Sequence, residues 1–291
     1  MGAADVVPGV SGGTIAFISG IYNELIDSIN AFNLKTLRIL RKKGFKAAFQ
    51  EVNGKFLLSL LLGIGISVLS LARLFKWLIE THPILIWSFF FGLVLASIYF
   101  VGKQIKKWDF LTFIYLLTGS GFAYYISILP AMENHNQDWF LMLAGALAIC
   151  AMMLPGISGA FILLLLGVYK PALEAIHNFD IKKIALLGFG AVIGLLSFAR
   201  ILKWLFKHYK DRTLAVLTGF IIGSLNKIWP WKETLSYYTN SKGIQLPLTQ
   251  KSVSPFQVEN NQLLFAVLLA ILGFSLILFL EKIGQKSSEK V

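Results

Sequence analysis

The chain has 291 residues, of which 56% are hydrophobic and 14% are charged, and its formal net charge is +12. A soluble domain carries about 25% charged residues, so the composition excludes an ordinary soluble protein and indicates a membrane protein. The positive charge lies between apolar runs, which indicates membrane topology and anionic-lipid contact rather than nucleic-acid binding. The single cysteine, Cys150, excludes an intramolecular disulfide.

Apolar runs follow one another along the whole chain. A Pro-Gly motif near the start is followed by the basic stretch 35–55 and three predicted membrane spans. Two shorter arms flank a second Pro-Gly motif, and three more spans follow, the last after the long polar loop 230–262. The runs lie at 56–79, 84–101, 110–129, 139–153, 157–168, 184–206, 213–229 and 263–280. The two arms are too short to span, since crossing takes about 20 residues, so they predict a re-entrant hairpin with the outer segment 170–183 after it.

Two parts of the chain resemble each other. AADVVPGVSGGTIAFISGIY (3–22) aligns with CAMMLPGISGAFILLLLGVY (150–169) at an offset of 147, and ten of positions 4–35 are identical. Chance would give about two identities. A second block, SLARLFKWL (70–78), aligns with SFARILKWL (197–205) at an offset of 127. The chain is therefore predicted to be a duplication.

The predicted repeats cover 1–130, a re-entrant segment plus three spans, and 137–285, a re-entrant hairpin plus three spans. The second copy has an apolar lead-in before its motif, whereas seven residues precede Pro8. We therefore expect that the natural chain starts earlier or that this version is truncated.

The distribution of Lys and Arg predicts the orientation of the repeats, since these residues favour cytoplasmic loops. With 35–55 in the cytoplasm, 18 of the 27 Lys and Arg fall on that side and seven fall in outer loops. Block 70–78 then runs outward and its copy 197–205 runs inward. The sequence thus predicts an all-α polytopic integral membrane protein with an inverted-topology repeat, two re-entrant helical hairpins and about six full transmembrane spans. Such repeats are typical of transporters.

The motif Pro-Gly-x-Ser-Gly occurs once in each repeat, at 8–12 and 155–159. Pro and Gly break the helix, and broken backbone at membrane depth is tolerated where it is buried in protein or lines a cavity. Ser11 and Ser158 are placed as N-caps of the arms that follow, whose free N–H groups form an anion site. The alternative is a kink that only helps helices pack.

Two arginines occupy matching positions in the second block. Arg73 and Arg200 suit bidentate contact with phosphate, although both could instead reach the membrane interface beside Trp77 and Trp204. The first motif is more polar than the second, because Gly13 and Thr14 are replaced there by Ala and Phe. The candidate phosphate-binding residues are Pro8, Gly9, Ser11, Gly12, Gly13, Thr14, Pro155, Gly156, Ser158, Gly159, Arg73 and Arg200.

Asp5 and Glu24 are candidates for proton or sodium coupling, although Asp5 is equally explained as a solvated residue near a chain end and Glu24 as a loop-side charge. We expect no catalytic residue, no metal and no cofactor, because the sequence shows no His/Asp/Ser set, metal-ligand spacing or Walker-type loop. The residues alone indicate only a paired anion site in a transporter-like frame. They leave a transporter, a membrane phosphatase and a small-anion channel or carrier open.

Segment 2–22 (GAADVVPGVSGGTIAFISGIY), together with LPGISGAF at 154–161, resembles the PopT-type polyprenyl-phosphate transporters, a bacterial family formerly of unknown function. The resemblance implies a multi-pass protein of the bacterial cytoplasmic (inner) membrane. It implies transport of undecaprenyl phosphate from the outer to the cytoplasmic leaflet, which recycles the carrier lipid for peptidoglycan and cell-envelope synthesis.

Overall fold

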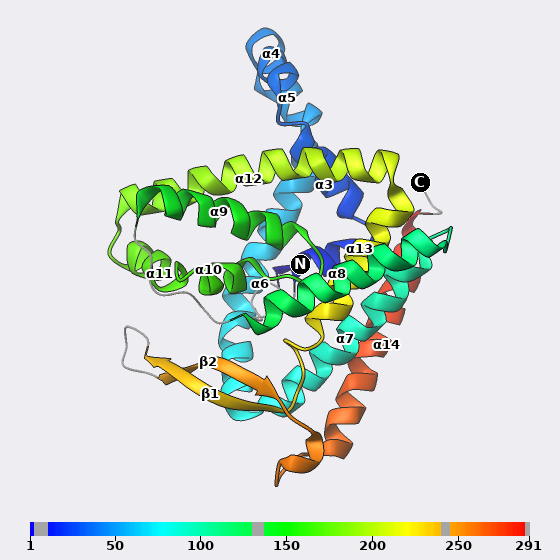
Figure 1. Ribbon diagram of the computed structural model, residues 1–291. Coiled ribbons are helices and arrows are strands. Elements are labelled where there is room, and N and C mark those ends of the chain that lie inside the picture. Colours follow the sequence, from blue (N-terminus) through cyan, green and yellow to red (C-terminus); the bar gives the residue numbers. More distant parts are fainter. Residues whose placement is uncertain (3–10, 130–136, 240–244, 289–291) are drawn as a thin grey trace.

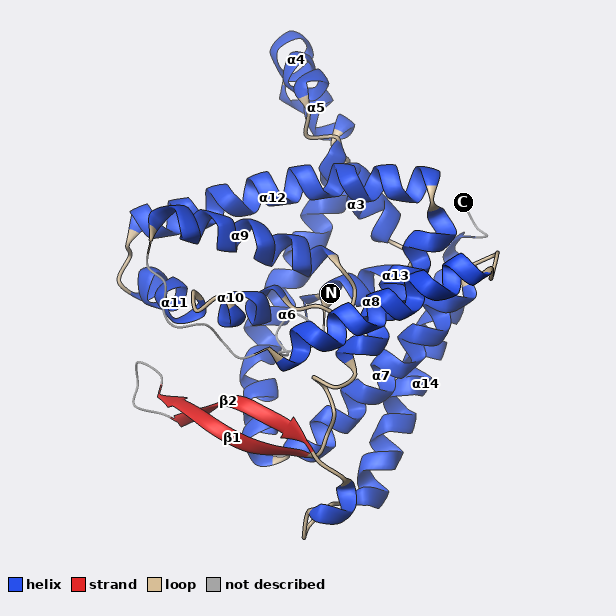
Figure 2. Cartoon of the chain, in the orientation of Figure 1, coloured by secondary structure: helices blue, strands red, loops and turns tan. Residues whose placement is uncertain are grey.

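The computed structural model describes residues 1–2, 11–129, 137–239 and 245–288, and these are mostly helical (Figure 2). The elements are α2 (Gly12–Ile18), α3 (Tyr22–Asn30), α4 (Leu34–Lys43), α5 (Phe45–Glu51), α6 (Gly54–Thr81), α7 (Pro83–Lys103), α8 (Phe110–Ile128), α9 (Asp138–Met153), α10 (Gly159–Leu165), α11 (Tyr169–His177), α12 (Ile181–His208), α13 (Lys210–Ser224), β1 (Lys232–Thr239), β2 (Gln245–Ser252), a 3-10 turn (Pro255–Gln257) and α14 (Leu263–Ser288).

Four helices in the described part of the chain, α6, α7, α8 and α12, are long and apolar enough to cross a membrane. The pair α10 and α11, bent by 111°, is a fifth candidate if it counts as one span. α13 has only 15 residues, and the apolar part of α14 ends at Phe279. A polytopic membrane protein is confirmed, whereas the number of six full spans stays a prediction.

Apolar side chains project outward from the long helices. On α6, Leu61, Ile66 and Leu69 are 64%, 67% and 83% exposed. Contiguous exposed apolar surface of this kind marks an interaction site or a membrane contact. The outward face of α6 is therefore suited to lipid.

The long helices pack in pairs, α7 with α14, α8 with α13 and α9 with α12 (Figure 1). Glycines lie where the backbones approach most closely: Gly119 faces Val216, and Gly223 faces Ser120 and Tyr124. These contacts advance in the same direction along both helices, so α8 and α13 run parallel. The distribution of Lys and Arg predicts the same parallel arrangement, because in it the segments of α8 and α13 both run from the cytoplasm to the outer side.

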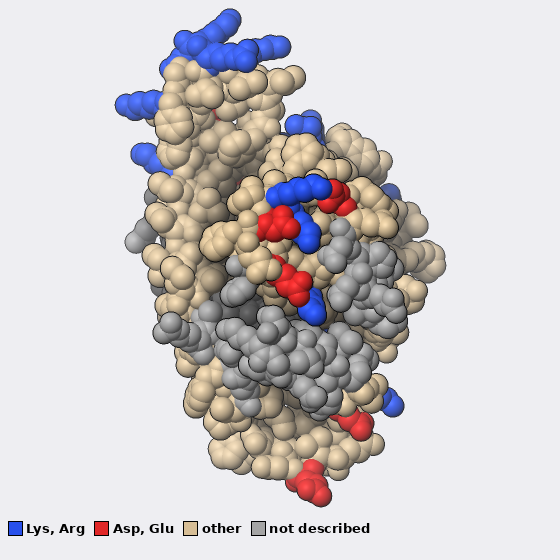
Figure 3. Space-filling model, turned by 90° about the vertical axis from the view of Figure 1, so that its left-hand side faces the viewer, with Lys and Arg blue, Asp and Glu red and all other residues tan. Residues whose placement is uncertain are grey.

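Two segments predicted as loops are helical. The basic stretch 35–55 contains α4 and α5, and Asn33 starts α4 by accepting from the backbone N–H groups of Lys35 and Thr36. These two helices project from the body (Figure 1), and Lys and Arg side chains gather at their tip (Figure 3). Segment 170–183 contains most of α11, because the chain turns at Gly167, with a φ of 67°, and resumes a helix.

The prediction of an all-α protein is wrong in the polar loop 230–262. There β1 and β2 form an antiparallel hairpin, with Lys232 opposite Ser252 and Glu233 opposite Lys251. Thr and Tyr in β1 favour strands, but a polar loop without a clear alternating pattern gave no strand signal. The Trp229 indole N–H donates to the Val253 carbonyl at 2.9 Å and fastens the hairpin to the end of the preceding helix.

Candidate functional site

The described residues that end the first motif and begin α2 lie against the second motif. The Ser11 Oγ donates to the Leu154 carbonyl at 3.1 Å, and the Thr14 Oγ1 accepts from the Gly156 N–H at 3.0 Å. Ser11 and Thr14 are 2% and 1% exposed. Two segments more than 140 residues apart are thus joined by part-buried hydrogen bonds.

Ser11 is the N-cap of α2, as the sequence predicts. Its backbone is extended, with φ −105° and ψ 130°, and its Oγ also accepts from the Gly13 N–H at 3.1 Å. A Cβ at Gly13 would lie 3.0 Å from the Met152 carbonyl oxygen and 3.1 Å from that of Met153. Glycine therefore allows α2 to approach the end of α9 closely.

The second segment breaks the chain between α9 and α10, which pack as a hairpin. Gly156 has φ +86°, and a Cβ there would lie 2.9 Å from the Ile221 Cα. Ser158 holds the N-cap position of α10, but its side chain makes no capping hydrogen bond. The two motif serines therefore differ: the Ser11 hydroxyl is bonded, and the Ser158 hydroxyl is available.

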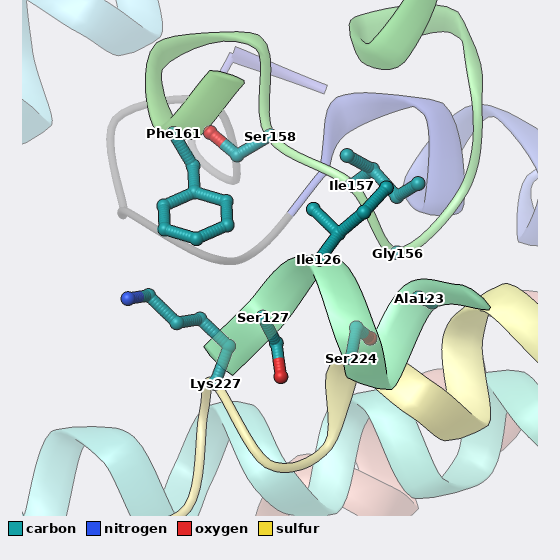
Figure 4. A pocket seen from close by; sticks show the side chains of 9 residues that line it. All are labelled: Ala123, Ile126, Ser127, Gly156, Ile157, Ser158, Phe161, Ser224 and Lys227. Carbon is teal, nitrogen blue, oxygen red and sulfur yellow. The ribbon is translucent and has the colours of Figure 1, made fainter. Parts of the chain in front are cut away.

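A small pocket lies beside the second break, between the C-terminal ends of α8 and α13 and the start of α10 (Figure 4). Its volume is about 20 Å³, room for about one water molecule. The Lys227 Nζ lies 4.2 Å from the centre of the Phe161 ring. The lining residues are Ala123, Ile126, Ser127, Gly156, Ile157, Ser158, Phe161, Ser224 and Lys227.

Two half-buried lysines dominate the electrostatics of this region. Both follow α13, which ends at Ser224, before the end of the predicted run 213–229, and both lie outside the helices long enough to span. Burial lowers the pKa of the Lys227 ammonium below its usual value. Burial, reinforced by the charge of Lys227, lowers the pKa of Lys232 to about 7. Burial thus disfavours the charged forms of both side chains, and a nearby anion would favour them.

The other glycine and proline candidates lie within the two motifs, whereas Arg200 and Glu24 lie away from them. Gly12 is buried at the start of α2, Pro155 is buried at the second break, and a Cβ at Gly159 would lie 2.6 Å from the Ala148 carbonyl oxygen. Arg200 is exposed on α12 and does not line the pocket. Glu24 is exposed and accepts from the Asn53 side-chain amide at 2.7 Å.

Four candidates fall outside the described parts of the structure. These are Asp5, Pro8 and Gly9 as whole residues, and Arg73 for its side chain. Among the described residues, no group of three His, Cys, Asp or Glu could hold a metal ion. The sequence also missed Lys227 and Lys232 as site residues, because it assigned them only to an outer loop.

The chain is similar to a family and to two curated proteins whose names refer to the translocation or transport of polyprenyl phosphates. A family model described as "VCA0040-like: Undecaprenyl phosphate translocase-like" matches residues 1–246. A curated protein of Vibrio cholerae serotype O1, named polyprenyl-phosphate transporter, is 48% identical over 98% of this chain and 94% of its own length. A polyprenyl-phosphate transporter of Staphylococcus aureus is 34% identical over 79% of this chain and 83% of its own. No solved structure matches the chain significantly.

Proposed function

The chain belongs to the VCA0040-like family of undecaprenyl phosphate translocase-like proteins, and from that premise we infer that it is a membrane transporter of polyprenyl phosphate. We further propose that it acts as a flippase, that undecaprenyl phosphate is its substrate and that the bacterial cytoplasmic membrane is its location. Its role there would be to return the carrier lipid for cell-envelope synthesis.

We propose that the lipid phosphate binds where the two Pro-Gly-x-Ser-Gly segments meet. The observation that carries this proposal is the pair of part-buried hydrogen bonds that join Ser11 and Thr14 to the backbone of the second segment. The pocket supports it, because Gly156, which donates to Thr14, lines the pocket together with Ser158. The polyprenyl tail would stay in lipid through a lateral opening.

The arginines would offset the phosphate charge in other states of the transport cycle. Arg200 lies outside the pocket, so contact with the substrate would require the halves to move relative to each other. Rocking of two inverted halves around a shared site is a general mechanism of such transporters.

The lengths of the elements support an internal repeat. α2 and α10 have seven residues each, and α3 and α11 have nine each. α6 and α12 have 28 each. Their first residues are separated by the same 147 and 127 positions as the sequence identities. We propose that these elements correspond in two inverted halves, 1–130 and 137–285.

The test is leaflet exchange of polyprenyl phosphate in vesicles containing the purified protein. We expect the wild-type protein to exchange the lipid, and Ser11→Ala and Ser158→Ala to slow exchange strongly. Ser197→Ala is the control, since this serine is exposed and its hydroxyl bonds only within α12. Full exchange by folded Ser11→Ala and Ser158→Ala variants would reject the site.

The same vesicles separate the alternative functions. Phosphate release from polyprenyl pyrophosphate would indicate a phosphatase, and anion flux without added lipid phosphate would indicate a channel or small-anion carrier. We expect neither activity. If wild-type vesicles exchange polyprenyl phosphate no faster than empty ones, the proposed function itself is wrong.

A further inference from the structure

Lys227 and Lys232 form a positive pair without a neutralising carboxylate. Among the described residues, every ion pair involves other lysines, and neither of these two takes part in one. The Lys232 Nζ donates to the Lys227 carbonyl at 2.5 Å, which holds the two residues together. An unpaired, half-buried charge is costly, so its presence calls for a partner.

An aromatic ring lies close to each of the two ammonium groups. The Lys227 Nζ lies 4.2 Å from the centre of the Phe161 ring, and the Lys232 Nζ lies 4.3 Å from that of Trp87. Ring faces attract cations, but more weakly than a charged partner. The cation–π contacts therefore attract the two ammonium groups but do not neutralise their charge, as a carboxylate or phosphate would.

Polar groups suited to a phosphate oxygen lie next to Lys227. Its side chain and the hydroxyl of Ser158 line the same pocket (Figure 4). Ser127 and Ser224 also line it, but their hydroxyls already donate to the carbonyls of Tyr124 and Ile221. The Ser158 hydroxyl has no hydrogen-bond partner among the described residues. A lysine ammonium beside one available hydroxyl can donate charge-assisted and neutral hydrogen bonds to the oxygens of a phosphate monoester.

The lysine pair is absent from the first half of the chain. The offset of 127 that aligns GLVLAS (92–97) with GFIIGS (219–224) pairs Lys227 with Phe100 and Lys232 with Ile105. These two partners are 6% and 4% exposed and belong to the hydrophobic core. The motif is duplicated, but the positive charge beside it is not.

We propose that Lys227 and Lys232 form a one-sided receiving site for the phosphate headgroup, in which Lys227 contacts the phosphate and Lys232 adds a second positive charge beside it. The pocket lies at the C-terminal ends of α8 and α13, which the charge pattern places on the outer face. The headgroup is therefore received from the outer leaflet and passed to the junction of the two segments. This inference rests on the proposed function, since it assumes a polyprenyl-phosphate substrate.

The test measures ligand binding to the purified full-length protein with geranylgeranyl phosphate, geranylgeraniol and inorganic phosphate as probes. Lys227→Met keeps the length of the side chain and removes the charge. It should weaken binding of geranylgeranyl phosphate by about tenfold, as for the loss of one charge-assisted hydrogen bond. Lys232→Met should weaken it less, and Lys227→Arg should retain most of it. Binding of the uncharged alcohol should not change.

The matched control is Lys251→Met, which removes a charge from an exposed position of the same hairpin and should leave binding unchanged. Lys227→Met should unfold at the same or a higher temperature than the wild-type protein, because an unpaired ammonium is removed. If it does not fold, Lys232→Met answers the same question.

The outcomes separate the two proposals. If the wild-type protein binds no geranylgeranyl phosphate, the proposed function fails. If the wild-type protein binds it and the Lys227→Met and Lys232→Met variants bind it equally well, the receiving site is wrong and the proposed function stands. If inorganic phosphate binds as tightly as geranylgeranyl phosphate, the site is not specific for a lipid headgroup, which also overturns the inference.

Discussion

At the scale of single residues, the two copies of the motif differ in the hydrogen bonds that their side chains make. Ser11 and Thr14 bond the first copy to the backbone of the second, and Tyr22 adds a third bond, from its hydroxyl to the Met153 carbonyl at 2.9 Å. Ser158 makes no such bond and lines the pocket instead. The first copy therefore fixes the geometry, and the second presents the available group.

Replacement of Thr14 by Val should destabilise the protein. The substitution keeps the shape of the side chain but leaves the part-buried Gly156 N–H without its acceptor. The cost is at most about 1–3 kcal/mol, the range for a fully buried donor. Thr14→Ser retains the hydroxyl and serves as the control. Thermal unfolding of the purified variants measures the difference, and equal unfolding temperatures for the two variants would contradict the importance of this bond.

The sequence predicted part of this site and missed the rest for a physical reason. Local patterns predicted that Ser11 caps a helix after a Pro-Gly break, because capping depends on a few neighbouring residues, and the structure confirms it. The partners of Ser11 and Thr14 depend on a close approach of distant segments. Lys227 was assigned to a loop because a lysine after a span is usually solvated, and only the fold reveals Phe161 beneath it.

At the scale of helices, close backbone packing sets where glycine is required. In α12, a Cβ at Gly190 would lie 1.9 Å from the Met142 carbonyl oxygen of α9, whereas a Cβ at Gly188 would meet nothing within 4 Å. Small residues at helix contacts are a common means of association in membranes. A larger side chain would therefore fit at Gly188 but not at Gly190 of the same helix.

This contrast gives a matched pair of substitutions. Gly190→Ala should destabilise the protein by about 1–3 kcal/mol, because an overpacked contact must move apart. Gly188→Ala should be neutral or stabilising by up to about 1 kcal/mol, since Ala favours a helix more than Gly does. Thermal unfolding of both variants in the same detergent tests the pair. A Gly190→Ala protein as stable as Gly188→Ala would argue against the packing of α9 on α12.

The observed helices show which elements the apolar pattern of the sequence can predict. The runs 56–79 and 184–206 predicted two helices that extend only two or three residues further at each end, as α6 (Gly54–Thr81) and α12 (Ile181–His208). Long apolar runs specify helices strongly. The hairpin of β1 and β2 gave no such signal, because its residues are polar and its strands form by pairing with each other.

For the whole molecule, the charge distribution predicts which ends face the cytoplasm. The basic tip of α4 should lie inside, and the β1–β2 hairpin should lie outside. The parallel packing of α8 and α13 agrees with this path. The orientation itself follows from the distribution of Lys and Arg.

Cysteine labelling in intact cells tests this orientation. In a Cys150→Ser background, Lys251→Cys should react with a membrane-impermeant maleimide from outside. Lys42→Cys, in the last turn of α4, should react only after the membrane is disrupted. The Cys150→Ser protein without an added cysteine is the control. Labelling of Lys42→Cys from outside would reverse the predicted topology.

The backbone at Gly156 has a mechanical consequence. Thr14 accepts from its N–H, its φ is +86°, and a Cβ there would lie 2.9 Å from the Ile221 Cα. Movement at Gly156 would break the bond to Thr14 and disturb this close approach, so we expect the junction to keep its shape when access alternates. Gly20, with φ +77° and nothing within 4 Å of a Cβ placed there, follows α2, and its counterpart Gly167, with φ +67°, follows α10; we expect the chain to bend at these two turns. We expect the binding junction to travel as one rigid block while the chain bends beyond it.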